Sequence, residues 1–128
     1  MPEPASAFSY AIIRVVPDIE RGEFVNAGVL FFARQHEFLA ARVQLDLAKL
    51  AALCPECDPS AVEAALKAFT RVADGEPDAG PMAALPMSER FGWLAAPSST
   101  VVQCSPTHTG LCTDPRKALD ELFADLVL

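Results

Sequence analysis

The stretch that decides the fold runs from Glu20 to Phe32 and reads ERGEFVNAGVLFF. It places three charged residues, two glycines and an asparagine between two apolar runs of β type. A plain hairpin requires only one or two turn residues at such a point. The additional ionisable groups therefore indicate a functional surface at the mouth of a sheet, although they match no catalytic motif.

Three strands of an antiparallel meander are expected around this stretch, at residues 8–16, 24–34 and 38–45. The first two are apolar on both faces, which is typical of strands that are covered on both sides. The third strand is more polar on one face, which is expected to contact solvent. Pro17 ends the first strand because a proline nitrogen cannot donate to the ladder.

Asn26 and Gly28 interrupt the apolar pattern near the start of the second strand. We expect both on the same face of that strand, followed by Leu30 and Phe32. Two interpretations stay open. Either the bare backbone permits close approach of a ligand or another chain, or the glycine marks a β-bulge that twists the hairpin.

Helix signals follow the meander. Aspartates that can cap a first helical turn precede three apolar segments, and proline directly follows two of them. These aspartates are Asp46, Asp58 and Asp114. Apolar residues recur at helical spacing over residues 59–73 and 115–127, so these segments are the two main predicted helices.

The remaining segments complete the predicted architecture. Residues 1–6 are expected to be disordered, residues 99–104 to form a short fourth strand, and residues 105–110 to form a loop. The sequence therefore predicts a single α+β domain over residues 1–128. Its mostly antiparallel sheet has about four strands, with a β-meander near 8–45 and a strand near 99–104, packed by helices near 59–73 and 115–127.

Length and composition restrict the class of protein. A chain of 128 residues with 52% hydrophobic and 21% charged residues is typical of one globular domain. A net charge of -7 disfavours general nucleic-acid binding and binding to anionic membranes. No apolar run approaches the roughly 18 residues that span a bilayer, and the N-terminus lacks a signal-peptide pattern. We therefore expect a cytoplasmic protein.

The first candidate site is the charged loop, residues 17–23, which contains Glu20, Arg21 and Glu23. In a functional interpretation, Arg21 binds an anion through its planar fork of donors. Glu23 then holds or activates a nucleophile or a metal ion. Alternatively, the loop is a solvated connection whose charges pair locally, each pair contributing under about 1 kcal/mol.

Two further candidates come from the C-terminal half. Arg90, Trp93 and Ser99 belong to a polar cluster in which Trp93 is expected to anchor the core. Arg90 is expected to pair with an acid of the charged loop. His108 lies in the predicted loop before the last helix, where it either acts as a general base or hydrogen-bonds the backbone.

The four cysteines suggest a metal or redox site only weakly. Cys54 and Cys57 have the two-residue spacing of a zinc knuckle or a redox pair. Cys104 and Cys112, however, lie seven residues apart, and a redox motif should follow a strand rather than a helix. We expect no metal, no cofactor and no disulfide, with all four side chains as reduced thiols.

Several segments resemble the bacterial domain-of-unknown-function 3037 family. They are residues 10–17, 20–29, 88–94, 97–103 and 105–110. The resemblance covers essentially the whole chain but implies no activity. It does imply a small stand-alone protein, often encoded beside a HipA-like kinase, and hence a partner or a shared pathway. The four cysteines are not part of the family's pattern.

Two functions remain open. In the first, the chain is a protein-binding or accessory module in which Arg14, Arg21 and Asn26 order a loop to which a partner protein binds. In the second, it is a hydrolase or transferase on a phosphate-containing substrate. Arg14, Arg21 and Arg90 would bind the anion, Glu23 would be the base or a metal ligand, and His108 the general acid or base. This reaction requires Glu23 and His108 within about 12 Å of each other.

Overall fold

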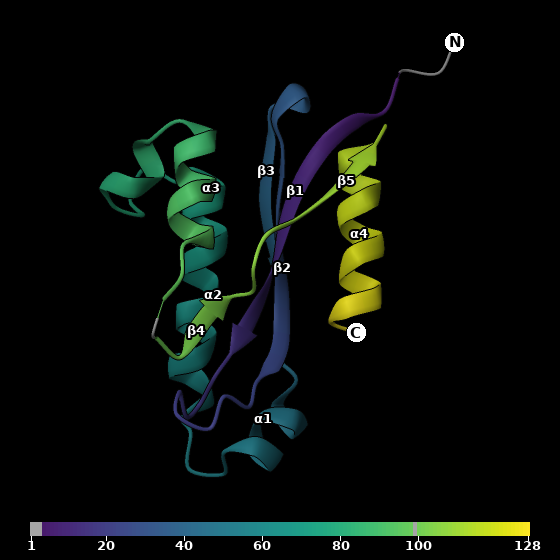
Figure 1. Ribbon diagram of the computed structural model, residues 1–128. Coiled ribbons are helices and arrows are strands. Elements are labelled where there is room, and N and C mark those ends of the chain that lie inside the picture. Colours follow the sequence, from purple (N-terminus) through teal and green to yellow (C-terminus); the bar gives the residue numbers. More distant parts are fainter. Residues whose placement is uncertain (1–3, 99) are drawn as a thin grey trace.

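The computed structural model describes residues 4–98 and 100–128, which form an antiparallel sheet with helices on both faces (Figure 1). The strands are β1 (Ser6–Val15), β2 (Val25–Ala33), β3 (Phe38–Val43), β4 (Val102–Cys104) and β5 (His108–Cys112). The helices are α1 (Leu47–Leu53), α2 (Pro59–Ala73), α3 (Met87–Ala95) and α4 (Pro115–Leu126), with 3-10 turns η1 (Arg34–His36) and η2 (Pro81–Ala84). The expected α+β class is confirmed, with one strand more than expected.

The three predicted aspartate caps are present. Asp46, Asp58 and Asp114 each accept a hydrogen bond from a backbone N–H of the first helical turn, at 3.0, 3.0 and 3.2 Å. The first backbone N–H groups of a helix have no partner within the helix, so these carboxylates satisfy donors that would otherwise be unpaired. The starts of α1, α2 and α4 are therefore set by local sequence.

The fourth and fifth strands share one edge of the sheet. Both β4 and β5 pair with β1 on the side away from β2. Between them, the Ser105 N–H donates to Ile12 O at 2.8 Å, and the Ser105 Oγ accepts from the Ile12 N–H at 2.8 Å. Pro106 therefore interrupts the edge without ending it. The prediction of a loop over residues 105–110 is wrong from His108 onward, because β5 begins there.

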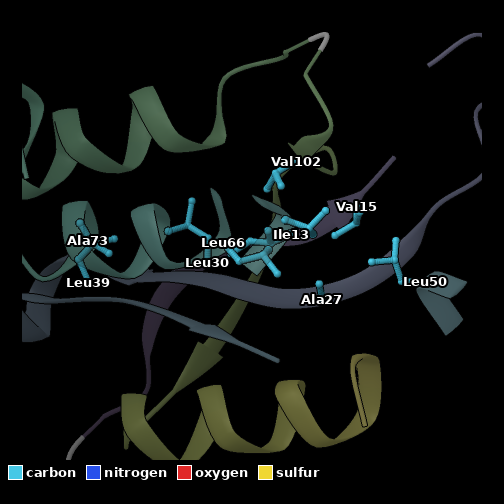
Figure 2. Packing of buried hydrophobic residues seen from close by; sticks show 10 residues of the cluster. Ile13, Val15, Ala27, Leu30, Leu39, Leu50, Leu66, Ala73 and Val102 are labelled. Carbon is cyan, nitrogen blue, oxygen red and sulfur yellow. The ribbon is translucent and has the colours of Figure 1, made fainter. Parts of the chain in front are cut away.

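The sheet separates two apolar cores. Helices α2 and α3 cover one face, where Ile13, Leu30 and Leu66 lie among the buried side chains (Figure 2). Helix α4 covers the other face, where Phe31 packs with Phe123. This arrangement accounts for strands that are apolar on both faces.

A β-bulge lies where β1 and β2 approach the charged loop. Ile13 pairs with Gly28, whereas Arg14 pairs with Asn26, so one residue of β2 has no partner in β1. The extra residue reverses the alternation of side chains. Asn26 consequently points to the α4 face, where its Nδ2 donates to Leu126 O at 3.1 Å. The expectation that Asn26 and Gly28 share a face is therefore wrong, and the bulge interpretation is confirmed.

The first strand starts earlier than expected. Ser6 already belongs to β1 and pairs with Cys112 of β5, so the expected disordered segment does not extend to residue 6. Residues 1–3 of that segment lie outside the described residues. Within the described part of the chain, no helix is both long and apolar enough to cross a membrane.

Candidate binding surface at the α1 end of the sheet

The charged loop and α1 lie together at one end of the sheet, at the bottom of Figure 1. A groove of about 870 Å³ opens between them. The loop lines it with Glu20, Arg21 and Glu23, and the opposite wall includes Leu53 and Cys54 at the end of α1. Three of the predicted site residues therefore line one concave surface.

Short-range hydrogen bonds order the charged loop. Asp18 accepts the Glu20 N–H with its side chain at 3.0 Å and the Gly22 N–H with its carbonyl at 3.1 Å. Gly22 has a φ of 72°, a left-handed conformation that favours glycine. Arg21 Nε donates to Glu23 Oε1 at 2.6 Å. Both side chains are largely exposed, so this pair orders the loop but contributes little stability.

The groove is acidic. Its lining carries one guanidinium, from Arg21, and four carboxylates, from Asp18, Glu20, Glu23 and Glu56. Of these four carboxylates, only that of Glu23 has an ion-pair partner among the described residues. The groove therefore presents a negative potential that attracts cationic groups, which is opposite to the anion site suggested by Arg21.

Helix α1 is apolar and mostly uncovered. Leu50, only 1% exposed, is its one buried residue, whereas Leu47 is 54% exposed. Ile19 of the charged loop and Phe24 beside it are also about half exposed. We call α1, Ile19, Phe24 and the groove the α1 surface. Sequence reasoning missed it, although the composition of α1, six apolar residues and one lysine, was a signal.

A second hollow of about 440 Å³ adjoins the groove and shares Ala52 and Leu53 with it. Phe24 and Asn26 form part of its lining. The Arg14 guanidinium stacks on the Phe24 ring, with 4.1 Å between Cζ and the ring centre. The structure thus brings Arg14 and Asn26 together at the base of the α1 surface. Both retain one buried polar atom, Arg14 Nε and Asn26 Oδ1, without a hydrogen-bond partner among the described residues.

The two catalytic candidates lie beside different parts of β1, His108 beside its middle and Glu23 beyond its C-terminal end. His108 pairs with Tyr10, and their rings are 5.3 Å apart. Glu23 precedes Val25, which pairs with Val15. Val15 is five residue steps along the strand from Tyr10, a rise of about 16 Å. Glu23 and His108 are therefore too far apart for the acid–base pair of the phosphate hypothesis.

The second polar cluster lies away from the charged loop. Arg90 donates to Ala83 O at 3.3 Å and packs against Gly75, at the corner between α2 and η2. Its expected pairing with an acid of the charged loop is wrong, because Arg90 is held at the corner between α2 and η2, whereas the charged loop lies at the bottom of Figure 1. The binding candidate Ser99 lies outside the described residues.

Trp93 is not a core residue. It is 62% exposed, whereas Phe91 and Leu94 of the same helix pack against the core. The Phe91 ring stacks on Phe32 with 5.4 Å between ring centres. At about 100° per residue, a helix that buries Phe91 and Leu94 turns Trp93 to its outer face. The expectation of a tryptophan anchor is therefore wrong.

Cys54 and Cys57 form a disulfide, which corrects the expectation of reduced thiols at these positions. Cys54 caps the C-terminus of α1, and the Cys57 N–H donates to Cys54 O at 3.2 Å. This turn places the two Cα atoms 5.5 Å apart, within the range that a disulfide bridges. The short connection between α1 and α2, with Asp58 capping the second helix, is what brings the sulfurs together.

The other two cysteines are free thiols. Burial raises the pKa of Cys104 to about 12, with a smaller opposing effect from Arg14. The pKa of Cys112 is also raised, first by desolvation and then by the charge of Asp114. Among the described residues, no three His, Cys, Asp or Glu side chains gather as metal ligands would.

Comparison with known proteins gives one match. A family model described as protein of unknown function (DUF3037) matches residues 10–127. No curated protein and no solved structure matches the chain. The match covers all of the segments on which the family resemblance rests, so that resemblance is confirmed.

Proposed function

This chain belongs to the DUF3037 family of proteins of unknown function, and we propose that it is a protein-binding module rather than an enzyme. The proposed ligand is a segment of a partner protein that carries apolar side chains flanked by lysine or arginine. The observation that carries the proposal is the α1 surface, where an apolar helix with one buried residue borders an acidic groove.

The apolar part of the α1 surface supplies the contact area. Isolated exposed apolar residues are ordinary on protein surfaces. Here Leu47, Ile19 and Phe24 are exposed at the same end of the sheet, and the groove and the second hollow lie on either side of Ala52 and Leu53. Grouped apolar side chains with a polar rim are typical of surfaces that bind another protein.

The charge of the groove supplies the selectivity. Four carboxylates and one guanidinium attract a basic segment and repel an acidic one. In this arrangement Glu20 contacts the ligand's cations, while Arg21 orders the Glu23 carboxylate through their ion pair. Arg14 holds Phe24 in this surface by stacking on its ring, and Asn26 holds the end of α4 beside it through the bond to Leu126 O.

The alternative of a phosphate-acting enzyme has less support. Its anion site would occupy a groove with an excess of carboxylates, and its acid and base lie beside the middle of β1 and beyond its C-terminal end. A HipA-like kinase is the partner that the family resemblance suggests. We propose such a kinase as the first folded protein to test, and a basic segment on its surface as the part that binds.

The test uses two labelled peptides with the same apolar residues, one with lysine and one with glutamate at its polar positions. Fluorescence anisotropy with the full chain should show binding of the lysine peptide at least about tenfold tighter. Added salt should weaken that binding because the charges are exposed. Equal affinity for both peptides, or no binding of either, would overturn the proposal.

A matched pair of variants locates the site. Leu47→Asp places a charge on the α1 surface and should abolish binding of the lysine peptide. Leu111→Asp changes another exposed leucine, 72% exposed on β5, and should leave binding unchanged. Both substitutions should leave the melting temperature nearly unchanged because both side chains are exposed. A loss of binding with Leu111→Asp alone would place the site elsewhere.

A further inference from the structure

The disulfide is part of the wall of the acidic groove. Cys54 lines the groove beside Leu53 and Glu56. Cys57, the other half of the bond, packs instead against the core between the sheet and α2. The two sulfur atoms therefore have different surroundings, and Cys54 is the one next to the open groove.

The same bond restrains α1. Leu50 is the helix's one buried side chain, and Asp46 caps its first turn. At its other end the chain turns directly from Cys54 into the cap of α2, and the disulfide closes that turn. A seven-residue helix is too short to be stable in water on its own. The position of α1 therefore depends on Leu50, its cap and the bond to Cys57.

We propose that Cys54–Cys57 is a reversible disulfide that dithiol reductants open from the groove at Cys54, and that its opening loosens α1. The attacking thiolate forms a mixed disulfide with Cys54 Sγ, and Cys57 leaves as a thiolate that takes up a proton. The second thiol of the reductant then releases Cys54 as a thiol. In total, two electrons and two protons pass to the chain, and the dithiol becomes a disulfide.

The charges of the groove select the reagent. Glu20, Glu23 and Glu56 lie on the approach to Cys54, together with Asp18 and the one guanidinium of Arg21. Focusing of this negative potential raises the local concentration of cations and lowers that of anions. A cationic thiol reagent therefore reaches Cys54 faster than an anionic reagent of the same size.

The other cysteines do not take part. Cys104 is largely buried, donates its S–H to Leu94 O at 3.3 Å and packs in the core. Cys112 pairs with Ser6 at the opposite end of β1 from the groove. They provide internal controls in the same chain.

The first test measures access to each sulfur. The full chain, reduced with dithiothreitol and freed of reductant, is exposed briefly to a cationic or an anionic methanethiosulfonate, and peptide mapping by mass spectrometry measures label at each cysteine. Cys54 should be labelled several-fold faster than Cys57. The cationic reagent should label Cys54 about tenfold faster than the anionic one, after correction for their rates with a free thiol. Equal labelling of Cys54 and Cys57, or no preference for the cation, would overturn entry from the groove.

The second test measures α1 itself. Amide hydrogen exchange of Leu53 and Cys54 should become about tenfold faster on reduction. Exchange in the middle of α2, at Leu66, should be unchanged. The variant Cys54→Ser/Cys57→Ser should exchange like the reduced chain, whereas Cys104→Ser should retain the redox dependence. Unchanged exchange in α1 on reduction would overturn the proposal.

The effect of reduction on ligand binding rests on the proposed function and is tested separately. Reduction should weaken binding of the lysine peptide, because α1 supplies part of its site. If α1 exchange responds to reduction while peptide affinity does not, the link to binding is wrong and the redox inference stands. If the oxidised chain binds no peptide, the proposed function fails, and the labelling and exchange results still decide the redox inference.

Discussion

Helices α1 and α2 follow each other in the chain and have opposite relations to the core. Helix α2 has fifteen residues with apolar side chains on one face, and it buries Val62, Leu66, Val72 and Ala73. Helix α1 is almost entirely apolar, yet it buries Leu50 alone. Apolar content by itself therefore does not predict burial. An apolar stripe opposite a polar face predicts packing against a core, whereas α1, which is apolar on nearly every side, leaves most of its residues exposed.

The largest expected effect tests this difference directly. Leu66→Ala should lower the free energy of unfolding by about 2–5 kcal/mol, because it removes packed methyl groups from a fully enclosed site. Leu47→Ala should change it by less than about 0.5 kcal/mol, because Leu47 is exposed. Urea denaturation of both variants measures the two values. A similar cost at both positions would show that α1 is a structural helix.

Alanine substitutions at two glycines, one crowded and one open, should have opposite effects on stability. A Cβ at Gly28 would lie 2.7 Å from Arg42 O and 2.9 Å from Val43 Cγ1. Gly28→Ala should therefore cost about 1–3 kcal/mol. At Gly92, in α3, a Cβ would meet no atom within 4 Å, so Gly92→Ala should stabilise by up to about 1 kcal/mol. Thermal unfolding of the two variants should shift in opposite directions, and a shift in the same direction would contradict the crowding inferred at Gly28.

Cys104, in the core, and Cys112, nearer the surface, should contribute differently to the pH dependence of the free energy of unfolding. The folded chain keeps the Cys104 proton up to a pKa of about 12, whereas an ordinary cysteine loses it near 9.0. Between about pH 9 and pH 12 the unfolded chain therefore binds fewer protons, and the free energy of unfolding falls as the pH rises. Cys104→Ala should remove part of that decline, as seen in urea midpoints across this range. Cys112→Ala, the control, should remove less, and equal effects of the two variants would contradict the prediction.

The smallest effect is expected in the charged loop. Arg21 and Glu23 form an ion pair in which both side chains are largely exposed. Arg21→Ala should therefore shift the free energy of unfolding by less than about 1 kcal/mol. At the same time it removes the one positive charge of the groove, so it should tighten binding of the lysine peptide. A large fall in melting temperature would make Arg21 a structural residue instead.

The fold was more predictable from sequence than the site. The caps at Asp46, Asp58 and Asp114 depend on hydrogen bonds to the next few residues, so local sequence was sufficient to predict them. The site depends on approach between distant segments. Glu20, Arg21 and Glu23 were correctly placed in one loop, but their acidic neighbour Glu56 and the apolar wall of α1 come from a later segment of the chain, residues 47–56.

The sequence by itself determined the class of fold, the main strands and helices, and the family, because alternation, helical spacing and caps act within a few residues. Tertiary structure decided what those patterns leave open. The bulge turned Asn26 toward α4, Ser105 carried the sheet edge past Pro106, and the turn between α1 and α2 joined Cys54 to Cys57. Each of these outcomes depends on how packed elements meet in space, which no local pattern records.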